Sequence, residues 1–128
     1  MGNTERRKYP RVQIFDPISY LSLDSDSEII HQNVAVVRDV SQTGIQMEAF
    51  LEVKSKKLSL MLFDMHKNQI EVKGKVVYCR RNESGQFSIG IQFIGNEAEN
   101  LRFVKALVKS YHYQKEKSRL AISPGIQN

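Results

Sequence analysis

The sequence lacks most of the features that mark disulfide frameworks, metal sites and membrane spans. Cysteine occurs once, at Cys79, so no internal disulfide can form, and its neighbours are apolar or basic rather than metal ligands. The three histidines, His31, His66 and His112, are scattered without the spacing of a metal site. No apolar run approaches the roughly 20 residues that cross a bilayer. We therefore expect neither a metal centre nor membrane insertion.

Other absences disfavour an enzyme and a nucleic-acid platform. Ser41 is the nearest candidate nucleophile, but no base is placed convincingly beside it, so we do not expect catalysis. The first residues, Met1 to Arg6, have no apolar core of a secretory signal, and the expected location is the cytoplasm. The middle of the chain has no basic stripe with interleaved aromatic residues, so we do not expect DNA or RNA as the partner.

Charge points instead to a compact anion. The 19 basic residues exceed the 14 acidic ones, which gives a net charge of +5. The cations gather near the two ends of the chain, at 6–11 and 102–119. A positive balance of this kind favours an anionic partner without identifying it.

A two-residue alternation of apolar and polar side chains predicts six strands. The pattern is strictest where Phe87, Ile89, Ile91 and Phe93 alternate with polar residues or glycine. Short polar links at 64–68 and 82–86 favour hairpins, so an antiparallel meander is expected rather than parallel strands with crossover helices. The six predicted strands are 18–23, 34–40, 45–49, 58–63, 70–79 and 87–94.

The alternation ends at Gly95, and a helical pattern follows. Asn96 can cap a helix with Glu99 as its capping-box partner, and apolar residues recur at helical spacing from Leu101 to Tyr111. This apolar stripe is expected to cover an open end or a flank of a small barrel. We therefore predict one domain: an amino-terminal arginine segment at 1–11, a six-stranded antiparallel β-barrel at 12–95, a helix at 96–117 and a frayed tail at 118–128.

Two short segments carry most of the polar chemistry. Arg7 and Arg11 present two guanidinium groups, which bind phosphate oxygens in pairs and can lie flat on a base. Asp39, Ser41 and Gly44 supply a carboxylate, a hydroxyl and a glycine between two predicted strands. Taken singly, the first segment is a solvated basic face and the second a turn in which side chains cap backbone amides. Together they suggest two halves of one nucleotide site.

This combination resembles the PilZ domains, bacterial receptors for cyclic di-GMP. The resemblance rests on R-x-x-x-R at Arg7 and Arg11, on D-x-S-x-x-G at Asp39, Ser41 and Gly44, and on a barrel with a final helix. It covers essentially the whole chain and implies a stand-alone, non-enzymatic domain with cyclic di-GMP as its ligand and no cofactor. Arg7 and Arg11 would then fold over phosphates and a guanine, Asp39 would accept from guanine N1 and N2, and Ser41 would bond a phosphate or guanine edge. Gly44 would let the backbone turn beneath the ligand.

The amino-terminal segment leaves more open. Residues 1–11 have little apolar surface, so we expect them to be mobile without ligand and ordered with it, and this change would signal to an unidentified downstream protein. Arg6 is either one more solvated cation or a group that stacks on a second guanine and favours an intercalated ligand dimer. Two alternatives remain: a PilZ-like adaptor with weak or no nucleotide binding, and a small barrel that binds RNA or single-stranded DNA through its basic ends.

Overall fold

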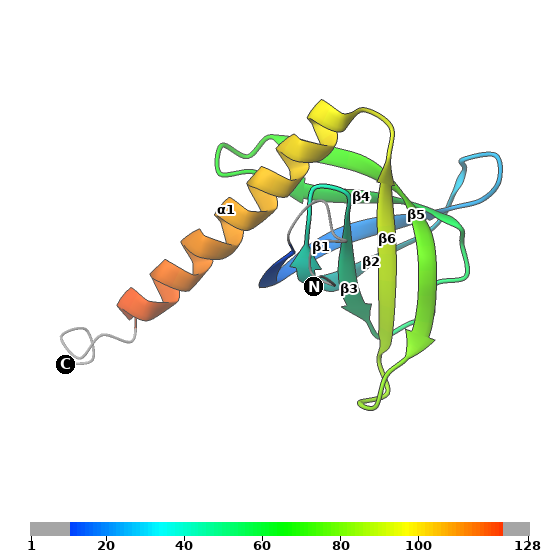
Figure 1. Cartoon of the computed structure of the whole chain (residues 1–128), viewed down its shortest axis with the longest axis horizontal. Coiled ribbons are helices and arrows are strands. Elements are labelled where there is room, and N and C mark those ends of the chain that lie inside the picture. Colours follow the sequence, from blue (N-terminus) through cyan, green and yellow to red (C-terminus); the bar gives the residue numbers. More distant parts are fainter. Residues whose placement is uncertain (1–10, 122–128) are drawn as a thin grey trace, which may run out of the picture.

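The chain folds into a closed six-stranded β-barrel followed by one long helix (Figure 1). The structure is a computed structural model, and residues 11–121 are described. The predicted fold class, a six-stranded antiparallel barrel with a carboxy-terminal helix, is confirmed. The elements are β1 (Val12–Leu23), β2 (Ile29–Val40), β3 (Gly44–Ala49), β4 (Lys57–Phe63), β5 (Gln69–Arg81), β6 (Phe87–Ile94) and α1 (Glu97–Ala121).

The strand order around the barrel is β1-β2-β3-β6-β5-β4, and every neighbouring pair is antiparallel. The chain therefore forms two three-stranded meanders, joined through β3 and β6 on one side and through β1 and β4 on the other. The prediction of one continuous meander was wrong, because the segment 50–56 carries the chain from Ala49, which pairs with β6, to Lys57, which pairs with β1. Closure of the barrel in this way pairs the edge strands of one meander with those of the other.

The first two strands are longer than predicted. β1 begins at Val12 instead of residue 18, and β2 begins at Ile29 instead of residue 34. In β1 the buried positions alternate regularly from Ile14, but the polar Asp16 faces inward and Phe15 faces outward, so the sequence shows no apolar alternation there. In β2 the first residues are exposed on both faces, so they show no alternation, and pairing with β1 alone holds them as a strand.

The helix closes the core through its first half. Phe103 and Leu107 are fully buried, and Phe103 meets Phe93 of β6 edge to face with ring centroids 5.9 Å apart. The predicted cap is confirmed, because the Glu99 amide donates to Asn96 Oδ1 at 3.0 Å. The helix extends to Ala121, beyond the predicted end at 117, and residues 122–128 of the expected tail lie outside the described residues.

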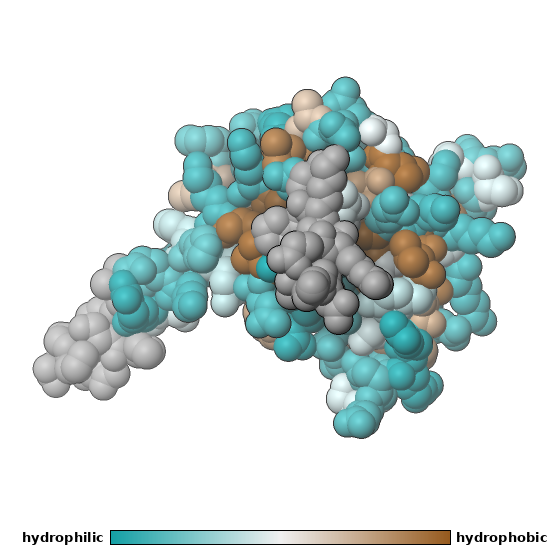
Figure 2. Space-filling view, viewed as in Figure 1, coloured by the Kyte–Doolittle hydropathy of each residue, from teal (hydrophilic) through white to brown (hydrophobic). Residues whose placement is uncertain are grey.

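The second half of α1 projects away from the barrel (Figure 1), and its surface is hydrophilic (Figure 2). All side chains from His112 to Arg119 are exposed. Within residues 11–121 there is no helix with the length and apolar character required to cross a membrane.

One carboxyl group is buried where the helix meets the barrel. Asp16 is 6% exposed on β1, and its side chain hydrogen-bonds Ser110 of α1. Burial raises the pKa of Asp16, and the hydrogen bond from Ser110 offsets this only in part. The carboxyl therefore holds its proton more tightly in the folded chain than in the unfolded one.

Asp16→Asn is expected to increase the free energy of unfolding at neutral pH. Because the folded pKa of Asp16 is raised, stability contributed by this group falls as pH rises from its unfolded pKa, about 3.9, through the folded value. The gain from asparagine should therefore shrink towards zero at acid pH. Denaturant unfolding of wild type and variant across this range measures it, with the exposed Asp26→Asn as the matched control. An equal loss of stability at both ends of the range would show that the bond to Ser110 outweighs the burial of charge.

Candidate functional site

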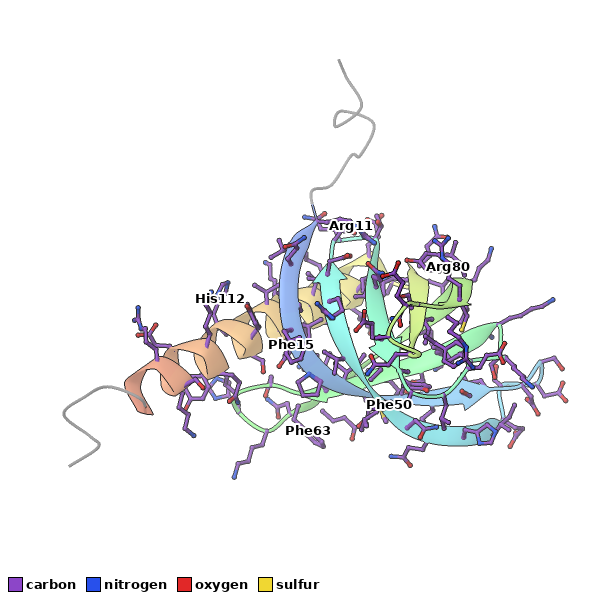
Figure 3. The ribbon with its side chains drawn as sticks, turned by 90° about the horizontal axis from the view of Figure 1, so that it is seen from below. Arg11, Phe15, Phe50, Phe63, Arg80 and His112 are labelled. Carbon is purple, nitrogen blue, oxygen red and sulfur yellow. The ribbon has the colours of Figure 1, made fainter. Side chains whose placement is uncertain are left out.

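Three of the predicted site residues meet where β1 begins and β2 ends. Arg11 Nε lies 3.2 Å from Asp39 Oδ1, and Arg11 Nη1 donates to Ser41 Oγ at 3.4 Å. Figure 3 shows Arg11 at the start of β1, next to the point where the described chain begins. The second arginine of the first motif and two residues of the second motif therefore form one cluster. Arg6 and Arg7 lie outside the described residues.

A β-bulge determines how Asp39 is presented. The pairing of β2 with β3 shifts register between Val37 and Asp39, and Val37 and Val40 are both fully buried. Two consecutive side chains, Arg38 and Asp39, therefore lie between inward-facing valines and point out of the barrel. A regular strand would have turned one of these two side chains into the core.

The Asp39 carboxylate keeps an unused acceptor. Its Oδ1 is buried, yet no described group donates a hydrogen bond to it. Arg11 Nε is within ion-pair distance of this oxygen, but its hydrogen does not point at the oxygen, so the contact is electrostatic only. A buried acceptor without a donor is costly to the folded state. The same burial covers the oxygen, so an N–H group of a ligand can reach it only if a neighbouring side chain moves.

Ser41 holds the turn that follows β2. Its amide donates to the Gly44 carbonyl at 2.9 Å, and its hydroxyl accepts from the Thr43 amide at 3.3 Å. The same hydroxyl lies 3.1 Å from Thr43 Oγ1. The simple interpretation of Ser41 as a turn-capping residue is therefore correct, and its hydroxyl also positions Arg11. Direct contact of Ser41 with a ligand stays a prediction.

Gly44 is required by packing within the barrel. A Cβ at this position would lie 2.2 Å from the Ile91 carbonyl oxygen and 3.3 Å from Gln92 Cα on β6. Both are backbone atoms, which cannot move aside cheaply. The sequence interpretation assigned this glycine to the approach of a ligand, and the structure adds a separate reason for it.

The sequence interpretation missed an aromatic contact on the outer face of the barrel. The strand register aligns Asp39 with Gln46, Gln46 with Gly90 and Gly90 with Tyr78 across this face. The Tyr78 ring covers Gly90, where an added Cβ would lie 2.3 Å from the ring, and the Arg80 guanidinium stacks 4.3 Å from the ring centroid. Three strand spacings, roughly 14 Å, separate Tyr78 from Asp39, so this contact lies apart from the cluster.

A polar hollow of about 480 Å³ lies next to Asp39, with Gln13, Gln46 and Tyr111 among its lining residues. Its remaining charges are paired, since Arg38 Nη1 donates to Glu48 Oε1 at 2.8 Å. Within residues 11–121, no group of three or more histidine, cysteine, aspartate or glutamate residues is placed to hold a metal ion. The arrangement offers donors, acceptors and a flat ring, which are the elements of a binding site.

A family model identifies the domain, and solved structures share its fold. The model of the PilZ domain matches residues 5–110. Among 17 similar solved chains, the cyclic di-GMP-bound PilZ domain of YcgR from Escherichia coli has a TM-score of 0.59 at 10% identity, covering 91% of this chain and 99% of that one. The search of curated proteins gave no match.

Two longer proteins share the fold. The inhibitor of motility MotI/DgrA of Bacillus subtilis has a TM-score of 0.54 at 17% identity, covering 89% of this chain and 53% of that one. The MrkH–c-di-GMP complex of K. pneumonia has a TM-score of 0.54 at 19% identity, with 88% and 54% covered. This chain thus spans about half of each. PilZ domains are non-enzymatic receptors for cyclic di-GMP. The chain belongs to the PilZ domain family.

Proposed function

We propose that this chain binds cyclic di-GMP through its arginine segment and the turn from Asp39 to Gly44. The observation that carries the proposal is the contact of Arg11 with both Asp39 and Ser41, which joins the two motifs at one place. Arg6 and Arg7 precede this place by a few residues, so they are within reach of the same ligand. Family membership and the hollow beside Asp39 support the proposal.

The chemistry of the ligand matches the groups around the cluster. Cyclic di-GMP has two phosphates and two guanines, and each guanine offers N–H donors along one edge. The carboxylate of Asp39 suits those donors once a neighbouring side chain moves to admit the ligand, and the guanidinium of Arg11 suits a phosphate or guanine O6 and N7.

Isothermal titration with cyclic di-GMP tests the proposal, with GTP and a short oligonucleotide as comparison ligands. Saturable binding of cyclic di-GMP alone is the expected result. Tighter binding of the oligonucleotide would support the RNA or single-stranded DNA alternative, and no binding of any of the three would support the adaptor alternative. The cytoplasm, where cyclic di-GMP would be met, is the proposed location.

The number of ligands bound tests the role of Arg6. If Arg6 stacks on a second guanine, wild type should bind two molecules of cyclic di-GMP per chain and Arg6→Leu should bind one. The stoichiometry of the titration measures this directly. One ligand per chain in the wild type would remove the special role of Arg6.

We propose that the signal is a fixed arrangement of residues 1–11, made by the ligand and recognised by a protein partner. Binding bridges this segment and the Asp39 turn, so it favours the docked arrangement. Hydrogen exchange at residues 5–12 should therefore slow on saturation with cyclic di-GMP, while exchange in β6 stays unchanged. Equal exchange with and without bound ligand would contradict this mechanism.

A further inference from the structure

A second, larger cavity lies at the other end of the barrel from Arg11. It measures about 810 Å³ and is formed by the end of β1, the start of β2 and the connection from β3 to β4. Arg11 precedes the first residue of β1, whereas Leu23, at the last residue of that strand, lines this cavity. The lining begins at Tyr20, nine residues after Arg11, so the two sites are separated by roughly 30 Å along the path of β1.

The lining of this cavity mixes apolar and polar side chains. Ile30 and Leu51 line it and are 50% and 58% exposed. Tyr20 and Ser22 reach it from inside the barrel, where both are buried. Burial raises the pKa of Tyr20, so its phenol stays protonated at neutral pH. A cavity of this size that offers both apolar surface and polar groups can hold a small ligand.

Three lysines, Lys54, Lys56 and Lys57, line the same cavity. Across the described part of the chain, none of their ammonium groups forms an ion pair. Two acidic residues, Asp24 and Glu52, share the lining, and Asp24 Oδ1 also accepts from two backbone amides of its own turn, at 2.9 Å each. Three lysines against two carboxylates leave the lining with one positive charge in excess. The cavity therefore combines apolar surface with a small surplus of positive charge.

We propose that this cavity binds an apolar group that carries a carboxylate or phosphate. The apolar part would cover Ile30 and Leu51, and the anion would lie among the three lysines. Such chemistry is found both in small amphipathic anions and in peptide segments where acidic side chains flank an apolar one. The proposal rests on the cavity alone and is independent of cyclic di-GMP binding.

Titration of the ¹⁵N-labelled full chain, followed by NMR, tests the proposal with paired probes. Sodium octanoate, kept below its micelle concentration, should shift the amides of Ile30, Leu51 and 54–57 saturably, whereas octan-1-ol should bind about tenfold or more weakly. An acetylated, amidated Glu-Leu-Glu-Phe-Glu peptide distinguishes the sources. Shifts of the same amides by the peptide assign the site to a protein segment, and shifts by octanoate alone assign it to a small amphiphile.

Two variants with the same change of charge separate this site from general electrostatics. Lys54→Glu with Lys56→Glu should weaken octanoate binding about tenfold or more, while Lys105→Glu with Lys109→Glu, on the exposed face of α1, should leave it unchanged. Leu51→Ser, at an exposed position, should also weaken binding without change of charge. Equal binding by the two double variants, equal binding of octanoate and octan-1-ol, or no saturable shift with octanoate or the peptide would overturn the proposal.

Discussion

Arg11→Ala is expected to lower the affinity for cyclic di-GMP about 100-fold or more, because it removes charge-assisted hydrogen bonds of roughly 1.5 to 3 kcal/mol each. Arg11 also contacts both Asp39 and Ser41, so its loss removes the group that links the two motifs. The fold should persist, because Arg11 precedes the first strand. Calorimetric titration measures the affinity, and thermal unfolding measures the stability.

Arg102→Ala is the matched control for this experiment, since Arg102 is an exposed arginine on α1 and the change of charge is the same. Asp39→Ala should behave as Arg11→Ala does, because it removes the carboxylate that is proposed to accept the guanine N–H groups. Unchanged affinity in the Arg11 variant would show that cyclic di-GMP does not bind at this end of the barrel. A comparable loss in the Arg102 variant would mean that net charge, and not the cluster, governs binding.

Gly44→Ala is expected to lower the free energy of unfolding by about 1 to 3 kcal/mol or more, the usual cost of forcing atoms into a packed interior. The new Cβ would meet the Ile91 carbonyl oxygen at 2.2 Å, so β3 and β6 would have to separate. Denaturant unfolding measures the loss. Ligand binding should weaken as well, through damage to the strand that follows the Asp39 turn.

Gly90→Ala gives a matched comparison on the strand that pairs with β3. Its Cβ would meet the Tyr78 ring at 2.3 Å, and a side chain on the outer face can turn away more cheaply than a backbone carbonyl can. We therefore expect a smaller loss of stability in Gly90→Ala than in Gly44→Ala. Equal losses would show that β6 yields as readily as the ring, and would contradict the packing account of Gly44.

The fold class was predictable because its signals are local. The strict alternation from Phe87 to Phe93 follows from the two faces of one strand, and the cap at Asn96 depends on residues within one helical turn. The strand order was not predictable in the same way. The pairing of β3 with β6 joins Gly44 to Gln92, and nothing in either local pattern specifies that partner.

The candidate site, like the fold, was predictable only where its signals are local. Arg11, Asp39 and Ser41 were identified by residue type and spacing, and the structure brings them into contact. The bulge that turns both Arg38 and Asp39 outward has no pattern in the sequence, because an extra residue in a strand merely breaks the alternation. The contact of Tyr78 with Gly90 was missed since it depends on the register between β5 and β6.

The joining of two meanders has a consequence for folding. β2 pairs with β1 through a short turn, but the outer edge of β3 is satisfied only by β6, whose paired residues follow 38 to 48 positions later. Contacts of such high sequence separation form slowly, because a long loop must close before they do. A chain emerging from the ribosome therefore displays both motifs before β6 exists to hold the second motif's turn, where the Phe93 amide donates to the Thr43 carbonyl at 2.8 Å. The first hairpin brings Arg11 to Asp39, and closure of the barrel then fixes the turn that follows.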